Sequence, residues 1–347
     1  MAMTDGLTLG LDVSDKYTNY CLLDCEGEVS EEGRLKTSEP IIRKRFEGTP
    51  CRVIIEAGAH SPWLSRMFEG MEYEVIVANP RRVQLIAQSN RKNDRANAET
   101  LARLGRADPK LLGPVKHRDQ QAQADLAVIR GRNALVAART LLINHVRGAV
   151  KSVGARLPAS DAHSFHQKAK EHIPQELRLA LEPLIDAVEQ LSLQIRAADR
   201  RVKALIEERY PAANCLQQVA GVGPLISLSF ILTIGDPTRF QRSRELGPYL
   251  GLVPRQRESG DSSPALRISK AGDSFLRHLL VNRAQYILGY RGPDCDLRRW
   301  GLNRAAGGKA AKKRAVVGVA RRLAVLLHRL WVTGEVYEPL RRGAVAA

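Results

Sequence analysis

Hydrophobic and polar residues alternate along the first part of the chain in the pattern of short strands. In residues 7–13, a leucine or valine occupies every second position from Leu7 to Val13, and Asp12 falls on the opposite face. We expect four more strands: residues 17–24, a polar segment near 28–36, the apolar run 51–56 and residues 73–80.

Helices are expected between and after these strands. The patterns at 40–47 and 62–70 predict two of them, and a third begins near Asp94. Three strands followed by alternating helix and strand is the order of the RNase H-like fold. The periodicity by itself indicates only an α/β unit with a mixed sheet.

Residues 119–210 have a helical period throughout. Apolar residues recur there at alternating spacings of four and three, which is the a/d seam of a coiled coil. The seam comprises Leu177, Leu181, Leu184, Val188, Leu191, Ile195, Ala198, Val202 and Leu205. Because proline is tolerated in a first helical turn, we expect the continuous helix to begin at Pro183. A second long helix is expected at 119–150, and the pair could form a hairpin or join two protomers.

The remainder of the chain predicts a compact, mostly helical domain at 215–288. Residues 298–329 then carry ten Lys and Arg and no acid, which suggests a basic, partly loop-like tail on a helix. We therefore expect three parts: an α/β domain at 1–110, a helical coiled-coil linker at 111–210 and a carboxy-terminal domain at 211–347.

Composition narrows the class of protein. The 347 residues are 44% hydrophobic and 26% charged, as in a chain that folds around real cores. The chain has 54 Lys and Arg against 37 Asp and Glu, a net charge of +17, which favours a polyanionic partner. A ribosome-associated or generally basic surface is the alternative explanation.

Cysteine usage and hydropathy indicate where the protein works. The five cysteines form no CxxC pair, so they suggest neither a zinc site nor a disulfide framework. No apolar run reaches the roughly 18 residues that a membrane span needs. We expect a protein of the reducing cytoplasm, without a membrane partner.

Three acids stand where a metal site could form. Asp12 is the acid of the first strand, Glu56 ends a second apolar strand, and Asp94 opens a helix. Carboxylates that converge from different elements hold Mg²⁺ through oxygen ligands in enzymes that transfer phosphoryl groups. Each acid also has a plainer explanation, since acids commonly cap strand ends and helix starts.

A glycine pair lies between two apolar helical stretches in the carboxy-terminal part. Gly221 and Gly223 give a pattern similar to a helix-hairpin-helix element, in which glycines let backbone N–H groups approach phosphates. A plain turn between two helices accounts for the same residues equally well.

Four segments resemble the amino-terminal domain of the DEDD transposases of insertion sequences, a group that includes the Piv-type DNA invertases. They are GLDVS, VIIEAGAH, VIVANPRRV and KNDRANAETLARL. That domain resembles the Holliday-junction resolvase RuvC. The resemblance implies that Asp12, Glu56 and Asp94 are the first three acids of a Mg²⁺ site. Asn97 stands where the fourth aspartate is expected, and it offers a metal a carbonyl oxygen but no charge.

The segment ELGPYLGLVPRQRESGDSSPALRISKAGDSFLRHLL resembles the carboxy-terminal domain of the same transposases. The resemblance implies that Ser259 is a nucleophile. On the residues alone, Ser262 and Ser263 are equal candidates. A serine that attacks a phosphodiester needs cations around it, and Arg255, Arg257, Arg267, Lys270 and Arg277 supply them. We expect nucleic-acid contacts from these residues and from Gly221, Gly223, Lys309, Lys312, Lys313 and Arg314.

The resemblance spans nearly the whole chain and implies a recombinase that cuts DNA through a phosphoserine intermediate. It also implies Mg²⁺ at the acids, a dimeric or tetrameric assembly, DNA partners at element ends and target, a structured guide RNA, and association with the bacterial nucleoid. Other functions stay open: an RuvC-like nuclease or a Piv-type invertase that works without RNA, or a catalytically inactive nucleic-acid-binding relative. Asn97 is the residue that favours the last of these.

Overall fold

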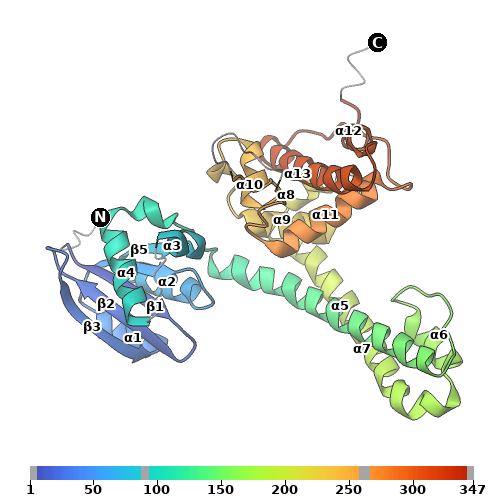
Figure 1. Cartoon of the computed structure of the whole chain (residues 1–347), viewed down its shortest axis with the longest axis horizontal. Helices are drawn as coiled ribbons and strands as arrows, with labels where there is room; N and C mark the ends of the chain where they lie inside the picture. Colours follow the sequence, from blue (N-terminus) through green and yellow to red (C-terminus); the bar gives the residue numbers. More distant parts are fainter. Residues whose placement is uncertain (1–5, 87–93, 258–265, 342–347) are drawn as a thin grey trace. The chain divides into compact units, whose positions relative to one another are not determined.

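The computed structural model describes residues 6–86, 94–257 and 266–341, with the backbone alone at 85, 86 and 94–96. The chain divides into two compact units, Met1–Asp119 and Gln120–Ala347 (Figure 1). The three-part division expected from the sequence is finer than this one and stays a prediction.

The first unit is built on a mixed five-stranded sheet in the order β3-β2-β1-β4-β5. The strands are β1 (Thr8–Val13), β2 (Tyr17–Leu23), β3 (Val29–Lys36), β4 (Arg52–Glu56) and β5 (Glu74–Ala78). The first three are antiparallel neighbours, and β4 and β5 run parallel to β1. The mixed sheet that alternation predicts is confirmed.

Helices cover both faces of this sheet. Helices α1 (Glu39–Phe46) and α2 (Ser61–Glu69) pack with Leu9 and Leu11 in one core. Helix α4 (Asp94–Ala107) lies on the other face. The expected strand at 73–80 was too long, because β5 ends at Ala78 and Pro80 opens helix α3 (Pro80–Ile86). Proline lacks an N–H and fits the first turn of a helix.

The backbone of α4 lies directly on β1 because residue 10 has no side chain. A Cβ at Gly10 would stand 2.1 Å from the carbonyl oxygen of Ala98 and 2.7 Å from the backbone nitrogen of Ala102. Ala98 and Ala102 are themselves fully buried. A second glycine, Gly105, makes room for the side chain of Ile54 on β4. Small residues on both elements therefore set the position of α4 over the sheet.

A segment at 113–118 is fixed along the edge of β5 before the first unit ends. The Val115 N–H donates to the carbonyl oxygen of Val77 at 2.8 Å. The His117 ring nitrogen Nε2 lies 2.8 Å from the hydroxyl oxygen of the buried Ser61. Burial, followed by the positive charges of Arg66 and Arg118, holds the pKa of His117 below its ordinary value. The ring is therefore neutral in this contact at physiological pH.

Two long helices open the second unit and pack antiparallel to each other (Figure 1). These are α5 (Gln120–Ser152) and α7 (Arg178–Glu208), and α6 (Phe165–His172) packs at their far end. The expected seam is buried in part: Leu181, Val188, Ile195, Val202 and Leu205 are buried, whereas Leu184, Leu191 and Ala198 are half-buried. The start predicted at Pro183 was wrong. The helix begins five residues earlier, and the proline lies inside it.

A buried carboxylate joins the ends of the two long helices. Asp125 of α5 accepts hydrogen bonds from Arg209 at 2.9 Å and from the Tyr210 hydroxyl at 2.8 Å. A buried charge is costly unless it is paired and hydrogen-bonded, and here it is both. Asp125 therefore sets the register in which α7 returns along α5.

The rest of the second unit is a helical bundle, as expected for 215–288. Its helices are α8 (Ala212–Leu216), α9 (Pro224–Ile234), α10 (Leu246–Tyr249), α11 (Ser274–Leu288), α12 (Asp296–Ala305) and α13 (Lys309–Thr333). The partly loop-like tail predicted at 298–329 was wrong. Val319, Leu323 and Leu327 of α13 are fully buried in the largest core. The basic residues therefore lie on the exposed face of a helix that packs into this core. Among the described residues, no helix has the length and apolar character that a membrane crossing requires.

The contact between Gly10 and α4 gives a stability prediction. We expect Gly10→Ala to push α4 away from β1 and to cost about 1–3 kcal/mol or more, as overpacking of a tight interior does. Hydrogen exchange of the α4 amides in the full chain measures this as faster opening. Gly58→Ala is the control, because the nearest atom to a Cβ there is 4.0 Å away. Unchanged α4 protection in Gly10→Ala would contradict the account.

The lowered pKa of His117 predicts a pH dependence. Because the folded protein binds this proton less readily than the unfolded chain, the contribution of neutral His117 is present above the unfolded pKa of about 6.5 and is lost as the pH falls below it. We expect the thermal midpoint to fall between pH 7.5 and pH 5.5, and to fall less in His117→Gln. His145→Gln, at an exposed position on α5, is the matched control. Equal pH dependence in both variants would refute the assignment.

Candidate functional site

Two of the predicted acids leave the sheet side by side. Leu11 of β1 pairs with Ile55 of β4 in parallel register, so the next residues, Asp12 and Glu56, emerge together at the carboxyl ends of neighbouring strands. Both side chains are partly exposed. Alternation along a strand places Asp12 on the face of Gly10, which is the face that α4 covers.

Helix α4 brings the third polar residue to this edge. The Asn97 amide nitrogen Nδ2 donates to the carboxylate oxygen Oδ2 of Asp12 at 3.1 Å. Asp94 is the first residue of the same helix, one turn before Asn97, and its side chain lies outside the described residues. The described side chains form no cluster of three or more His, Cys, Asp and Glu suited to a metal. A Mg²⁺ site that includes Asp94 therefore stays a prediction.

The ligand atoms present are of the kind that Mg²⁺ binds. Asp12 and Glu56 offer carboxylate oxygens, which hard divalent cations prefer. The amide of Asn97 turns its nitrogen toward Asp12. An amide nitrogen donates hydrogen bonds and cannot bind a cation. Rotation of the amide by half a turn would present its oxygen instead. The residue set fits the ion, with a rearrangement at Asn97.

The loop that follows Glu56 is held by residues that the sequence did not single out. The Ser61 hydroxyl accepts from the Gly58 N–H at 3.0 Å and donates to the Gly58 carbonyl at 2.9 Å. Trp63 donates to Nδ1 of His60, so the proton of a neutral His60 is on Nε2, which faces Asp15 at 3.1 Å. His60 therefore ties the loop after β4 to the loop after β1. Its place four residues after Glu56 in VIIEAGAH was the available signal.

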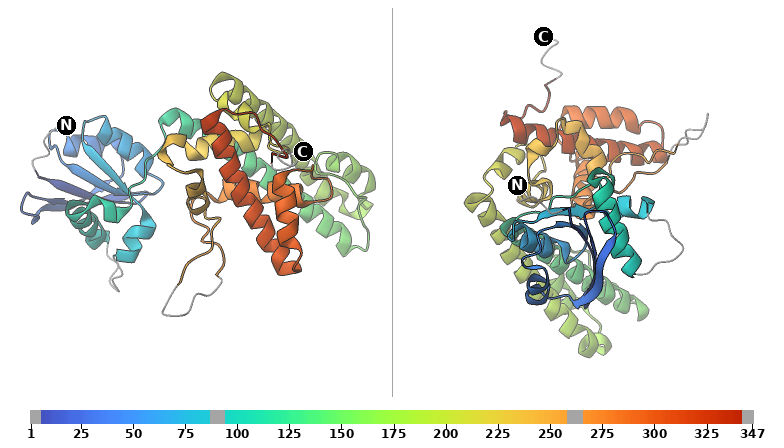
Figure 2. Two further views of the ribbon diagram at one scale, coloured as in Figure 1. Left: turned by 90° about the horizontal axis from the view of Figure 1, so that it is seen from above. Right: turned by 90° about the vertical axis from the view of Figure 1, so that its left-hand side faces the viewer.

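The predicted nucleophile Ser259 lies in residues 258–265, outside the described residues. The stretches of chain on either side of it, residues 252–257 and 266–270, are described, and we call them the two limbs of the serine segment. Pro254 and Ile268 form an antiparallel bridge, and the Arg255 N–H donates to the Arg267 carbonyl at 3.0 Å. Figure 2, left, shows the limbs leaving the helices side by side. A short two-stranded ladder therefore forms the base of the serine segment.

Two glycines let the base of this ladder close. Gly251 and Gly272 both have a positive φ, +65° and +67°, a backbone conformation that residues other than glycine rarely adopt. A Cβ at Gly251 would lie 2.2 Å from the Ala271 nitrogen, and one at Gly272 would lie 2.1 Å from the Tyr249 carbonyl oxygen. The backbones at 249–252 and 270–272 therefore touch directly.

Arg277 braces the same base. Its guanidinium donates to the carbonyl oxygens of Leu250 at 2.9 Å and Ala271 at 2.6 Å. Asp273 caps the start of α11 through the Leu276 N–H and also pairs with Arg130 of α5. The predicted nucleic-acid contact of Arg277 is untested, and the geometry gives this residue a structural task.

The other predicted basic residues are exposed. Arg255, Arg257, Arg267 and Lys270 lie on the two limbs, and all four side chains are open to solvent. Lys309, Lys312, Lys313 and Arg314 occupy the first two turns of α13 and are exposed as well. Both sets are available to a phosphate backbone.

The predicted glycine pair lies in the turn between α8 and α9. Gly221 has a φ of +83°, and the space beside it is filled by the Arg283 side chain, whose terminal nitrogen would be 2.5 Å from a Cβ. Gly223 precedes α9, and a Cβ there would have no neighbour within 4 Å. The two glycines thus differ, because Gly223 is open and Gly221 is packed.

The net charge is divided unevenly between the units. Residues 1–119 contain 18 Lys and Arg and 18 Asp and Glu, whereas residues 120–347 contain 36 and 19. The first unit is therefore neutral overall, and the second carries the whole excess of +17. Attraction to a polyanion comes from the second unit.

Comparison with known proteins gives the family. Residues 9–154 match a family of DEDD transposases, and residues 213–295 match the Transposase IS116/IS110/IS902 family. The chain is 30% identical to a transposase for insertion sequence element IS1111A of Coxiella burnetii, over 91% of this chain and 90% of that one. It is 27% identical to a probable family 20 transposase of Pseudomonas aeruginosa, over 84% of this chain and 87% of that one.

A more distant relative is described as a gene-inverting protein. The chain is 23% identical to a pilin gene-inverting protein of Moraxella lacunata, over 91% of this chain and 92% of that one. Both family matches occur in the order that the sequence predicts, and the relatives are matched over nearly their whole length. The chain belongs to the IS116/IS110/IS902 family of transposases and has the DEDD amino-terminal domain of that family.

Proposed function

We propose that this transposase cuts and rejoins DNA through a phosphoserine intermediate at Ser259, under the guidance of a structured RNA, with Mg²⁺ bound at an acidic site. The acidic site comprises Asp12, Glu56, Asp94 and Asn97. The first unit takes an RNase H-like, RuvC-like fold in this proposal. Its support is the strand order β3-β2-β1-β4-β5, with acids at the ends of β1 and β4 and a polar residue reaching them from α4.

The observation that carries the serine step is the rigid base of the 258–265 segment. A nucleophile must be held in attack geometry, and elements fixed by packing hold it better than free loops do. The ladder at Pro254 and Ile268, the contact of Gly251 with residue 271 and the Arg277 brace fix the two described stretches of chain on either side of that segment. The exposed arginines of both limbs supply positive charge for a phosphodiester.

The reaction we infer is a transesterification. The Ser259 hydroxyl oxygen forms a bond to phosphorus, a phosphorus–oxygen bond of the DNA breaks, and the serine proton ends on the departing sugar oxygen. A second DNA hydroxyl then reverses the step and joins a new strand. Each step replaces one phosphate ester bond by another, so no nucleotide cofactor is required as an energy source. Asp12, Glu56, Asp94 and Asn97 would hold Mg²⁺, which would supply Lewis-acid stabilisation of the negative charge that develops on phosphate oxygens.

The guide RNA and the assembly are parts of the same proposal. The second unit carries a net charge of +17, which is more positive charge than the phosphates of one small DNA contact neutralise. The excess therefore suits a second nucleic acid. We propose a dimer or tetramer, since cutting two DNA segments and exchanging their ends takes more than one serine.

DNA inversion without RNA is the second candidate. The similarity to a pilin gene-inverting protein favours it. Inversion would use the same acids and the same serine, and it would differ in the arrangement of the DNA ends and in the lack of an RNA partner. RNA that co-purifies with the protein separates the two functions.

Ser259 gives the first test of the proposal. We expect Ser259→Ala to abolish covalent protein–DNA adducts while DNA affinity changes little, because one hydroxyl adds little to a large polyanion interface. Denaturing gels with labelled DNA measure the adduct. Ser262→Ala is the control and should keep it. RNA recovered from both variants should be the same.

An adduct that persists at the wild-type level in Ser259→Ala, or that maps to another residue, would refute the serine assignment. Absence of bound RNA from protein purified with its element's transcripts would refute the guide and leave inversion as the function.

Asn97 gives the test of the metal site. We expect Asn97→Asp to raise affinity for Mg²⁺, because a carboxylate replaces a neutral amide beside Asp12. Strand cleavage across a Mg²⁺ titration should improve at low Mg²⁺ and converge at saturation. A large gain that persists at saturation would mean that the natural residue cripples the enzyme, as the inactive-relative hypothesis requires. No change at any concentration would remove residue 97 from the site.

A further inference from the structure

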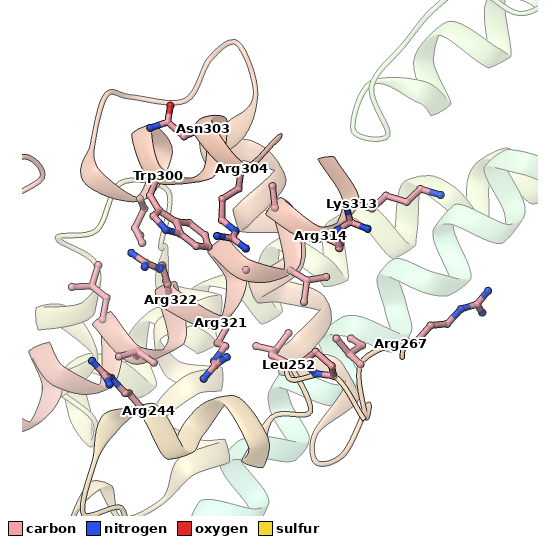
Figure 3. Close-up of a pocket in the computed structure, with 18 of the residues that line it drawn as sticks. Arg244, Leu252, Arg267, Trp300, Asn303, Arg304, Lys313, Arg314, Arg321 and Arg322 are labelled. Carbon is pink, nitrogen blue, oxygen red and sulfur yellow. The ribbon is translucent and has the colours of Figure 1, made fainter. Parts of the chain in front are cut away.

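An open groove of about 1400 Å³ lies on the second unit between α13, α12 and the two limbs of the serine segment (Figure 3). Its apolar floor includes Leu252, Ile268, Leu297 and Val325, with Trp300 at one side. Arg322 stacks on the Trp300 ring at 3.9 Å, and Arg304 approaches the same ring at 5.4 Å. The groove therefore combines an apolar floor with an aromatic wall.

The rim of the groove is cationic. Nine of the residues that line it are basic, and none is acidic: Arg244, Arg267, Lys270, Arg304, Lys313, Arg314, Arg321, Arg322 and Arg329. All nine are exposed. Arg329 pairs with Glu335. Six make no ion pair with a carboxylate in the described part of the chain: Arg244, Arg267, Arg304, Lys313, Arg314 and Arg321. So much uncompensated charge around one groove calls for an anionic occupant.

The groove is larger than the roughly 300–1000 Å³ of a small-molecule pocket. A polymeric anion suits it better, because the cations are spread along α13 from Lys313 to Arg329 and across to the limbs rather than gathered at one point. A double helix presents phosphates on a convex surface and keeps the faces of its bases stacked inside, away from the floor. A single strand can set its bases against apolar and aromatic side chains while its phosphates follow a cationic rim.

We infer that this groove binds single-stranded DNA, the strand that passes the serine segment during cutting. The inference rests on the proposed function, because it identifies the strand by the segment beside it. Leu252 and Pro254 from one limb, and Arg267 and Lys270 from the other, line the groove directly. A strand attacked within 258–265 must continue past these limbs, and the groove is the cationic surface that adjoins them.

The second unit offers a matched pair of variants for the test. Lys313 and Arg314 line the groove, whereas Arg200 and Lys203 of α7 are also exposed and lie outside it. Lys313→Gln with Arg314→Gln removes two charges from the groove. Arg200→Gln with Lys203→Gln removes the same charge away from it. Both doubles are made in full-length Ser259→Ala protein, with EDTA, so that binding is read without any chemistry.

Fluorescence anisotropy measures the affinity for a labelled DNA single strand of about 16 nucleotides across a salt series. We expect the groove double to weaken binding about tenfold near physiological salt and to lower the log–log salt slope by about 1.4, since each single-strand phosphate contact contributes about 0.7. The control double should change the affinity by less than about threefold. Circular dichroism confirms that both variants are folded.

Three results would overturn the inference. Equal losses in the two doubles would mean a general charge effect. A duplex of the same sequence that binds as tightly, with the same sensitivity to the groove double, would mean a duplex site. An RNA strand that loses affinity in the groove double while the DNA strand does not would make the groove an RNA site. The covalent adduct at Ser259 is a separate measurement, so a failed groove and a failed serine assignment can be told apart.

Discussion

Both candidate sites depend on backbone segments that touch with no side chain between them. In the first unit the carbonyl of Ala98 would be 2.1 Å from a Cβ at Gly10, and this contact brings Asn97 to Asp12. In the second unit Gly272 lies equally close to the Tyr249 carbonyl, which closes the ladder below the serine segment. Side-chain packing can adjust to a mutation, but a contact between two backbones cannot, because a methyl group has nowhere to go. Both candidate sites are therefore built where the fold is least able to relax.

The parts of the fold that follow from local pattern could be predicted from the sequence. Alternation located β1 and set Asp12 apart from Leu11, and the parallel pairing of β1 with β4 brings Glu56 to the same edge. Pattern could not give the position of α4, because the glycine and alanine residues that seat it are neutral in hydropathy. Glycine at position 10 was available as a signal, since a glycine inside a strand often marks a close backbone approach.

The second unit shows what a charge count misses. The many basic residues at 298–329 predict a partly loop-like tail, yet Val319, Leu323 and Leu327 place this run in the core. Helical period would have separated the two faces. Arg314 and Arg321 are two turns apart, as are Arg322 and Arg329, so they lie along one side of α13. Arg277 could not be recognised in the same way, because its partners are backbone carbonyls of residues 250 and 271.

The division of charge between the units separates binding from chemistry. Asp12 and Glu56 lie together in a unit with no net charge, and two neighbouring carboxylates repel the phosphates of DNA. That unit has little attraction of its own for DNA, whereas residues 120–347 attract any nucleic acid. Attraction to DNA therefore comes from the second unit. In the proposed function, the acids would act only on DNA that is already held, and a cation at this edge would control whether bound DNA is cut without controlling whether DNA is bound.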